Sequence, residues 1–118
     1  MDYLNFLLFA LIALFLLSRI LPTKGIRHIT MAELRTELGA KDKQFIDVRT
    51  QGEYKARSIN QFKNIPLHDI TVKASGLSKD QEVVVICQSG MRSNKASKLL
   101  KQQGFQKITN VRGGMNAW

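Results

Sequence analysis

The feature that most constrains the fold of this chain is an apolar run that leads directly into a loop and a helix. Residues 82–86 read EVVVI, a continuous β-branched stretch typical of a central parallel strand covered on both faces. Residues 93–103 then place Ala96, Leu99 and Leu100 on one face and lysines on the other, which predicts an amphipathic helix. Because a parallel strand requires a crossover connection, this unit predicts an α/β layered domain.

Further strands and helices alternate over residues 26–118. Thr30 and Glu33 have the spacing of a capping box, in which the two side chains satisfy amides at a helix start, and Gly39 is expected to end that helix. Short strands are predicted at 45–48, 64–67 and 108–111, and one or two helical turns at 51–56. This order of elements predicts a mainly parallel central sheet.

The first 21 residues have a different character. The stretch from Tyr3 to Leu17 reads YLNFLLFALIALFLL, which favours a membrane-spanning helix. A cleaved secretory signal would need a basic start and a small-residue cleavage site, but the start carries Asp2 and no such site follows the apolar run. A buried helix of this kind would need a larger core than the chain can build. We therefore predict a transmembrane anchor over residues 1–21, a linker over 22–25 and a folded domain over 26–118.

Charge suggests where such an anchor would place the domain. Arg19, Lys24 and Arg27 follow the apolar stretch and no lysine or arginine precedes it, so the positive-inside rule predicts a single-pass protein of the cell membrane with a cytoplasmic domain. The net charge is +9, which suits an anionic lipid surface. Nucleic acid is the rival partner, but the basic residues are scattered singly and no aromatic-rich strand accompanies them. We expect a membrane-facing surface and no nucleic acid.

The chemistry is expected in the loop CQSGMRS, residues 87–93. Cys87 is the single cysteine, so no intramolecular disulfide or multi-cysteine metal site is possible within one chain. A loop that enters a helix from the end of a parallel strand points backbone N–H groups at a common centre, and Gly90 eases that turn. Those dipoles would favour Cys87 as a nucleophilic thiolate, and Arg92 would add a fixed positive charge. The alternative is that Cys87 is a buried, inert thiol.

At these residues the chain resembles the rhodanese family of sulfurtransferases. The resemblance spans about residues 29–118. It rests on several motifs in order, namely Asp47-Val48-Arg49 with Glu53-Tyr54, Asn64-Ile65-Pro66-Leu67, the 87–93 loop, Gly104-Phe105 and Gly113-Gly114-Met115-Asn116-Ala117-Trp118.

Membership of this family would imply a three-layer domain and a defined chemistry. Cys87 would carry a sulfane sulfur as a persulfide and pass it to a thiol or to cyanide. The donor would be a small anion such as thiosulfate or a protein persulfide, held in part by Arg92. No metal and no organic cofactor would be needed. The persulfide would be cradled by amides of the loop, in residues Gln88, Ser89, Gly90, Met91, Arg92 and Ser93.

Two other functions compete with sulfur transfer. Cysteine phosphatases of related fold place five residues between cysteine and arginine, whereas four intervene here, and no proton-donating acid is evident near the loop. A second alternative is a non-enzymatic module for redox sensing or protein docking at the membrane. We expect Asp47, Arg49 and Glu53 to form an ion-paired group that supports the loop, and His28 and His68 to be packing or surface residues.

Overall fold

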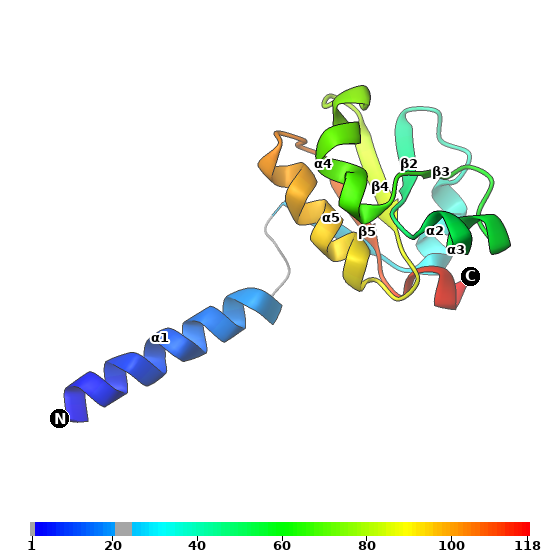
Figure 1. The fold of residues 1–118 in the computed structure, drawn as a ribbon. Helices are drawn as coiled ribbons and strands as arrows, with labels where there is room; N and C mark the ends of the chain where they lie inside the picture. Colours follow the sequence, from blue (N-terminus) through cyan, green and yellow to red (C-terminus); the bar gives the residue numbers. More distant parts are fainter. Residues whose placement is uncertain (1, 21–24) are drawn as a thin grey trace.

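The structure, a computed structural model, describes residues 2–20 and 25–118, so most of the predicted linker over 22–25 lies outside the described residues. Its centre is a five-stranded sheet in which every neighbouring pair is parallel, as predicted. Residues 82–86 form an inner strand (Figure 1), whereas the strand predicted at 64–67 is found at Lys63–Asn64 and ends before Pro66. The strands, in their order across the sheet, are β1 (Ile26–Ile29), β5 (Ile108–Val111), β4 (Glu82–Ile86), β2 (Lys43–Asp47) and β3 (Lys63–Asn64).

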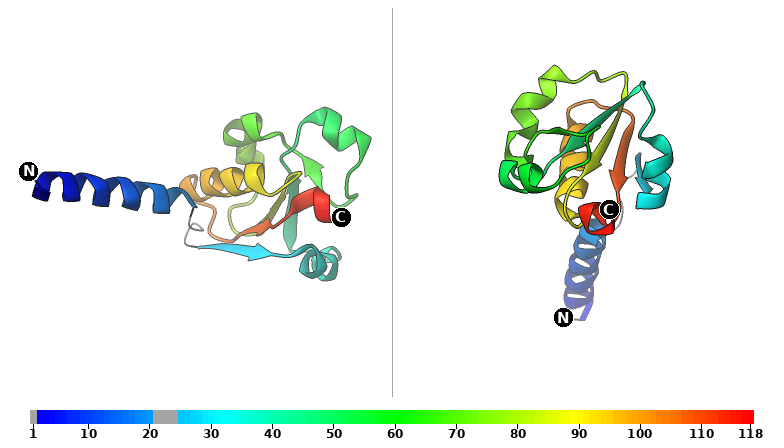
Figure 2. Two further views of the ribbon diagram at one scale, coloured as in Figure 1. Left: turned by 90° about the horizontal axis from the view of Figure 1, so that it is seen from below. Right: turned by 90° about the vertical axis from the view of Figure 1, so that its right-hand side faces the viewer.

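Helices cover both faces of this sheet and make a three-layer domain (Figure 2). Alternate residues of β4 point to opposite faces: Val83 and Val85 lie in one apolar cluster, and Val84 and Ile86 lie in the other. This double burial explains why the strand is continuously apolar rather than alternating. One cluster is covered by α4 (Ile70–Lys73) and α5 (Met91–Gln102), and the other by α2 (Met31–Glu37) and the 3-10 turn η3 (Gly114–Ala117). The remaining elements are α3 (Gln51–Ala56), η1 (Leu67–Asp69) and η2 (Ala74–Gly76).

The helix ends follow local rules that the sequence displays. The capping box of Thr30 and Glu33 is formed as predicted, and Thr50 with Glu53 forms a second one at the start of α3. α5 begins at Met91, two residues earlier than predicted, because Gly90 adopts a left-handed conformation and caps it. At the other end of α5, Phe105 turns back and donates its N–H to the carbonyl of Leu100, which brings its ring into the core.

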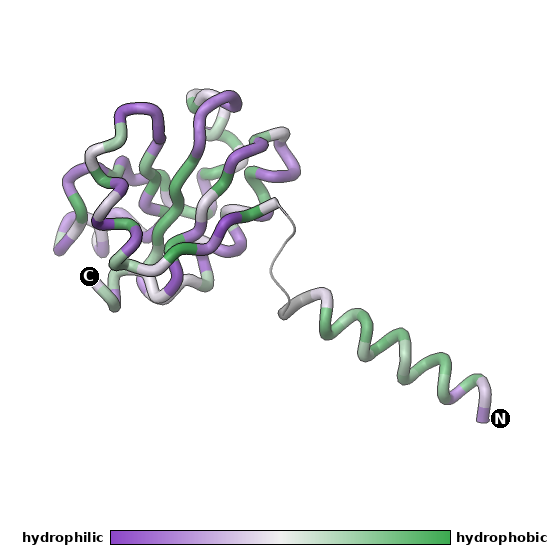
Figure 3. The backbone as a smooth tube through the Cα atoms, turned by 180° about the vertical axis from the view of Figure 1, so that it is seen from behind, coloured by the Kyte–Doolittle hydropathy of each residue, from purple (hydrophilic) through white to green (hydrophobic). Residues whose placement is uncertain are grey.

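The N-terminal helix α1 (Asp2–Ile20) has a surface of a different kind. Its apolar side chains are exposed, with Leu4, Phe6 and Phe9 each 71% accessible, and Figure 3 shows the apolar colour along the helix. None of the helices in the described ranges is sufficiently long and apolar to cross a membrane. The predicted transmembrane anchor over residues 1–21 is therefore not supported. The apolar stretch from Tyr3 to Leu17 is about 22 Å long, whereas a bilayer core is about 30 Å thick.

Candidate active site

Cys87 is the first residue after β4 and lies at the base of the 87–93 loop. Cys87 is fully buried and belongs to the apolar cluster beneath α5. The sulfur nevertheless has a polar contact, because the Gly90 N–H donates to Sγ at 2.9 Å. The Cys87 sulfur is therefore oriented toward the 87–93 loop.

The start of α5 supplies positive potential beside this thiol. Gly90 precedes the helix with φ 105°, a left-handed conformation that an L side chain would strain. It offers no side-chain cap, so the amides of the first turn keep their free N–H groups. The partial positive charge of a helix N-terminus stabilises a nearby anion. A sulfur anion at the loop would be stabilised in this way.

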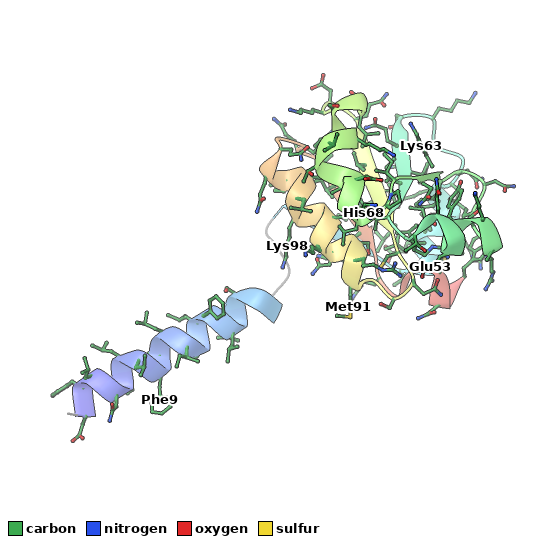
Figure 4. The ribbon with its side chains drawn as sticks, viewed as in Figure 1. Phe9, Glu53, Lys63, His68, Met91 and Lys98 are labelled. Carbon is green, nitrogen blue, oxygen red and sulfur yellow. The ribbon has the colours of Figure 1, made fainter. Side chains whose placement is uncertain are left out.

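The structure places the predicted site residues in different roles. Of the loop amides, that of Gly90 is the one within hydrogen-bond distance of Cys87 Sγ, and residues 91–93 form the first turn of α5. Ser93 is buried and its hydroxyl donates to the Gly90 carbonyl, which holds the turn. Ser89 is exposed, and Met91 is 80% accessible at the rim (Figure 4). The side chains of Gln88 and Arg92 reach away to partners outside the loop.

A turn near the C-terminus supports the loop from behind, a contact that sequence analysis did not foresee. The N–H of Met115 donates to the Cys87 carbonyl at 2.8 Å, and the N–H of Asn116 donates to the Gln88 carbonyl at 2.9 Å. The Gln88 amide also donates to the Asn116 side chain at 2.7 Å. Gly114 makes this approach possible, because a Cβ there would lie 2.2 Å from the Cys87 oxygen. In the sequence, the Gly113-Gly114 pair indicated that a turn forms here, but it did not indicate that this turn packs against the 87–93 loop.

A buried ion pair supports the loop from the side of β2. Asp47 and Arg49 are both almost inaccessible, and the Arg49 guanidinium donates to both carboxylate oxygens of Asp47 at 2.8–3.1 Å. The same guanidinium donates to the Gln88 side chain at 3.2 Å and to the Arg57 carbonyl at 2.7 Å. These contacts confirm the expectation that Asp47 and Arg49 pair and support the loop. Removing one partner would leave a buried charge uncompensated.

Arg92 is paired rather than free, which changes the expectation for its charge. Its guanidinium donates to both oxygens of Glu53, at 2.7 and 2.9 Å, and each side chain is about one-third exposed. The hydrogen bonds to Arg92, helped by those from Thr50, lower the pKa of Glu53 to about 2. The carboxylate likewise raises the pKa of Arg92. Any anion that binds this guanidinium would therefore have to compete with Glu53.

A cleft of about 420 Å³ lies in front of Arg92. Arg92 and Lys95 lie on its α5 side, and His68, which is exposed as expected, lies on the η1 side (Figure 4). Val48 and Leu67 contribute apolar surface between them. The cleft can accept a ligand that joins an anionic group to a small apolar part. No group of three or more potential metal ligands occurs in the described portion of the chain.

Comparison with known proteins places this arrangement in a family. The rhodanese-like domain family matches residues 30–118, which is most of the chain. The chain belongs to the rhodanese-like domain family. This result confirms the family expected from the motifs around Cys87, and it covers α2 through η3.

Relatives of this rhodanese-like domain share both sequence and fold. The chain is 44% identical over 94 residues to a Bacillus subtilis protein named "Putative sulfurtransferase YtwF", covering 79% of this chain and 90% of that protein. It is 38% identical over 78 residues to a sulfurtransferase of Allochromatium vinosum, covering 66% and 73%. The crystal structure of a rhodanese-like domain protein from Staphylococcus aureus superposes with a TM-score of 0.72 at 34% identity, covering 78% and 90%.

The Glu53–Arg92 pair leads to a prediction about donor affinity. Glu53→Gln removes the charge that competes for Arg92, so we expect KM for thiosulfate to fall by about threefold to tenfold, while kcat changes little. Steady-state kinetics over a range of thiosulfate concentrations measure this. The control is Glu33→Gln, which alters the equivalent capping box of α2. If KM for thiosulfate is unchanged or raised in Glu53→Gln, Glu53 does not compete with the donor for Arg92.

The same pair predicts how stability depends on pH. Because folding depresses the pKa of Glu53, its contribution is fully present above the unfolded value near 4.5 and is lost as the pH falls through about 2. Between pH 5 and pH 2, the unfolding midpoint of the native chain should therefore fall more steeply than that of Glu53→Gln. Thermal unfolding of both proteins at several pH values tests this prediction. Unfolding midpoints that fall in parallel with pH in the native chain and in Glu53→Gln would contradict it.

Proposed function

We propose that this chain is a sulfurtransferase that carries a sulfane sulfur on Cys87. The observation that carries the proposal is the position of Sγ, which accepts the Gly90 N–H at 2.9 Å next to the start of α5. A persulfide adds a second, negatively charged sulfur at this point, where the amide and the helix terminus would stabilise it. Relatives named as sulfurtransferases support the same chemistry.

The proposed reaction has two steps. The Cys87 thiolate attacks the outer sulfur of thiosulfate, the S–S bond of the donor breaks, and sulfite leaves with the electron pair. The enzyme is left with a Cys87 persulfide whose terminal sulfur carries the negative charge. A nucleophilic acceptor, cyanide or a thiolate, then attacks that sulfur and releases the Cys87 thiolate.

The cleft in front of Arg92 supports an anionic donor. Arg92, whose charge is paired with Glu53, and Lys95 lie on one wall, and Lys98 lies one helical turn beyond Lys95. Such a wall attracts thiosulfate, and it would also suit an acidic surface that surrounds a persulfide on a partner protein. Gln88, Ser89, Gly90, Met91 and Ser93 complete the proposed loop around the transferred sulfur.

The experiment that tests this function offers two donor classes to the purified full chain. With thiosulfate and cyanide we expect thiocyanate to form catalytically, and with an aryl phosphate we expect no hydrolysis above the uncatalysed rate. The four-residue spacing between Cys87 and Arg92 supports that preference. Hydrolysis of the phosphate without formation of thiocyanate would contradict the proposal.

A specific observation favours the second candidate, a redox-sensing or docking module. Cys87 has no accessible surface, which would shield a thiol from indiscriminate substrates. A sensing module would form the persulfide or an oxidised thiol but transfer nothing to cyanide or to thiols. Stoichiometric labelling of Cys87 without turnover would select this candidate over the enzyme.

We also propose that the protein associates with the cell membrane through α1, with the domain on the cytoplasmic side. The support is the exposed apolar surface of α1, together with the basic residues Arg19, Lys24 and Arg27, which suit the anionic cytoplasmic leaflet. The full chain should therefore sediment with membranes and deletion of residues 2–20 should release it. Recovery of both forms in the supernatant would contradict membrane association.

A further inference from the structure

A second cleft, of about 430 Å³, borders the same loop without including Arg92. His28 from β1 and Asn110 from β5 are paired in register across the edge of the sheet, and both line this cleft. Asn94 from the start of α5 lines the same cleft, and Arg112 follows β5 at its wall. Nothing in the proposed sulfur transfer uses this set of side chains.

Unpartnered polar atoms concentrate in this cleft. Over the described ranges 2–20 and 25–118, three buried side-chain nitrogen or oxygen atoms have no hydrogen-bond partner: His28 Nε2, Asn94 Oδ1 and Asn110 Oδ1. All three belong to residues that line the second cleft. Asn110 is only 3% exposed. A buried polar atom without a partner costs about 1–3 kcal/mol, so three such atoms in residues that line one cleft favour a bound polar group there.

Each of these atoms has a defined hydrogen-bonding role. Asn110 Nδ2 lies 3.2 Å from His28 Nδ1, and an amide nitrogen can only donate, so Nδ1 accepts. Burial, and to a lesser degree the charge of Arg112, lower the pKa of His28, which favours the neutral ring. The single ring proton then lies on Nε2, which becomes a free donor. The cleft therefore offers one histidine donor, one guanidinium and two amide oxygen acceptors.

We propose that this cleft binds a small zwitterion with adjacent ammonium and carboxylate groups, as in a free α-amino acid. The two amide oxygens of Asn94 and Asn110 would accept from the ammonium group. His28 Nε2 and Arg112 would donate to the carboxylate. A simple anion would face two amide oxygens, and a simple cation would face Arg112, so neither matches the set. Met91, exposed at the rim of the same cleft, would contact the side chain of the ligand.

The position of this site is independent of the sulfur chemistry but adjacent to it. Gly90 lines the cleft, and its N–H is the donor to Cys87 Sγ. A ligand in the cleft would therefore contact the loop that holds the thiol. The inference does not rest on sulfur transfer, and it can hold whether the domain is an enzyme or a sensor.

The test is a titration of the isotopically labelled full chain followed by nuclear magnetic resonance. The probe is L-serine, and the signals are the side-chain amides of Asn94 and Asn110 and the ring nitrogens of His28. We expect saturable shifts of all three sets and a ring proton on Nε2. Acetate and ethylamine, which each carry one of the two charges, should bind at least about tenfold more weakly, which corresponds to about 1.4 kcal/mol.

Variants identify the groups responsible. Arg112→Gln and Asn94→Ala should each weaken serine binding by about tenfold, whereas Lys55→Gln on the exposed surface of α3 should leave it unchanged. Both cleft variants lie at exposed or half-buried positions, so they test the site even if substitution of Asn110 impairs folding. The proposal fails if none of these signals saturates during the serine titration or if acetate binds as tightly as serine. It also fails if the only molecules found in contact with His28, Asn94 and Asn110 are ordered waters.

Discussion

Replacement of Cys87 by serine should abolish sulfur transfer from thiosulfate to cyanide, by at least about a thousandfold in kcat/KM. The hydroxyl of serine is a far weaker nucleophile at neutral pH and cannot hold a sulfane sulfur as a stable anion. The contact from the Gly90 N–H would be kept, so the loss would reflect chemistry rather than loop geometry. Initial rates of thiocyanate formation measure the effect.

Two further variants make this result interpretable. Because Cys87 is buried within an apolar cluster, a serine hydroxyl could also reduce stability, so Cys87→Ala provides a nucleophile-free chain without that polar group. Ser75→Ala, at an exposed position in η2, is the control and should keep full activity. If either Cys87 variant folds normally and still turns over thiosulfate, the assignment of Cys87 as sulfur carrier is wrong.

Gly114→Ala should have the largest effect on the fold of the active-site loop. Gly114 has φ 52°, and a Cβ at this position would lie 2.2 Å from the Cys87 carbonyl oxygen and 2.9 Å from the Gln88 carbonyl carbon. Backbone atoms cannot rotate away as a side chain would, so the C-terminal turn must separate from the loop. We expect a loss of about 3 kcal/mol in the free energy of unfolding.

Activity should fall together with stability in this variant, because the hydrogen bonds from Met115 and Asn116 hold the carbonyls of Cys87 and Gln88. Denaturant unfolding and thiocyanate formation measure the two effects. Gly52→Ala is the matched control: a Cβ there meets no atom within 4 Å, and alanine within α3 should be neutral or stabilising by about 0.5–1 kcal/mol. Equal behaviour of the two variants would contradict the close packing of η3 against the loop.

The elements that the sequence predicted well are those determined by residues close to one another along the chain. The continuous run in β4 indicated a doubly covered parallel strand, and Thr30 with Glu33 indicated a helix start, because both signals depend on near neighbours. The start of α5 was placed two residues too late because a left-handed glycine can cap a helix without a polar side chain. Hydropathy alone also suggested a membrane-spanning helix that the structure does not support.

The contacts that sequence analysis missed join distant segments. The approach of Gly114 to Cys87 and the pairing of Glu53 with Arg92 connect positions 27 and 39 residues apart, and no periodicity encodes such neighbours. The three unpartnered polar atoms come from β1, α5 and β5, which only the sheet order brings together. His28 was expected to be a packing or surface residue, and its neighbours give it a hydrogen-bonding environment that its sequence context does not reveal.

The most direct measurement is the mass of the intact protein after incubation with thiosulfate and removal of excess donor. Because Cys87 is the single cysteine, the added mass of one sulfur atom can be assigned to it, and cyanide should remove that sulfur as thiocyanate. We predict this gain and loss in the native chain and neither in Cys87→Ala. A folded native chain that acquires no sulfur from thiosulfate or from a protein persulfide would contradict the central claim.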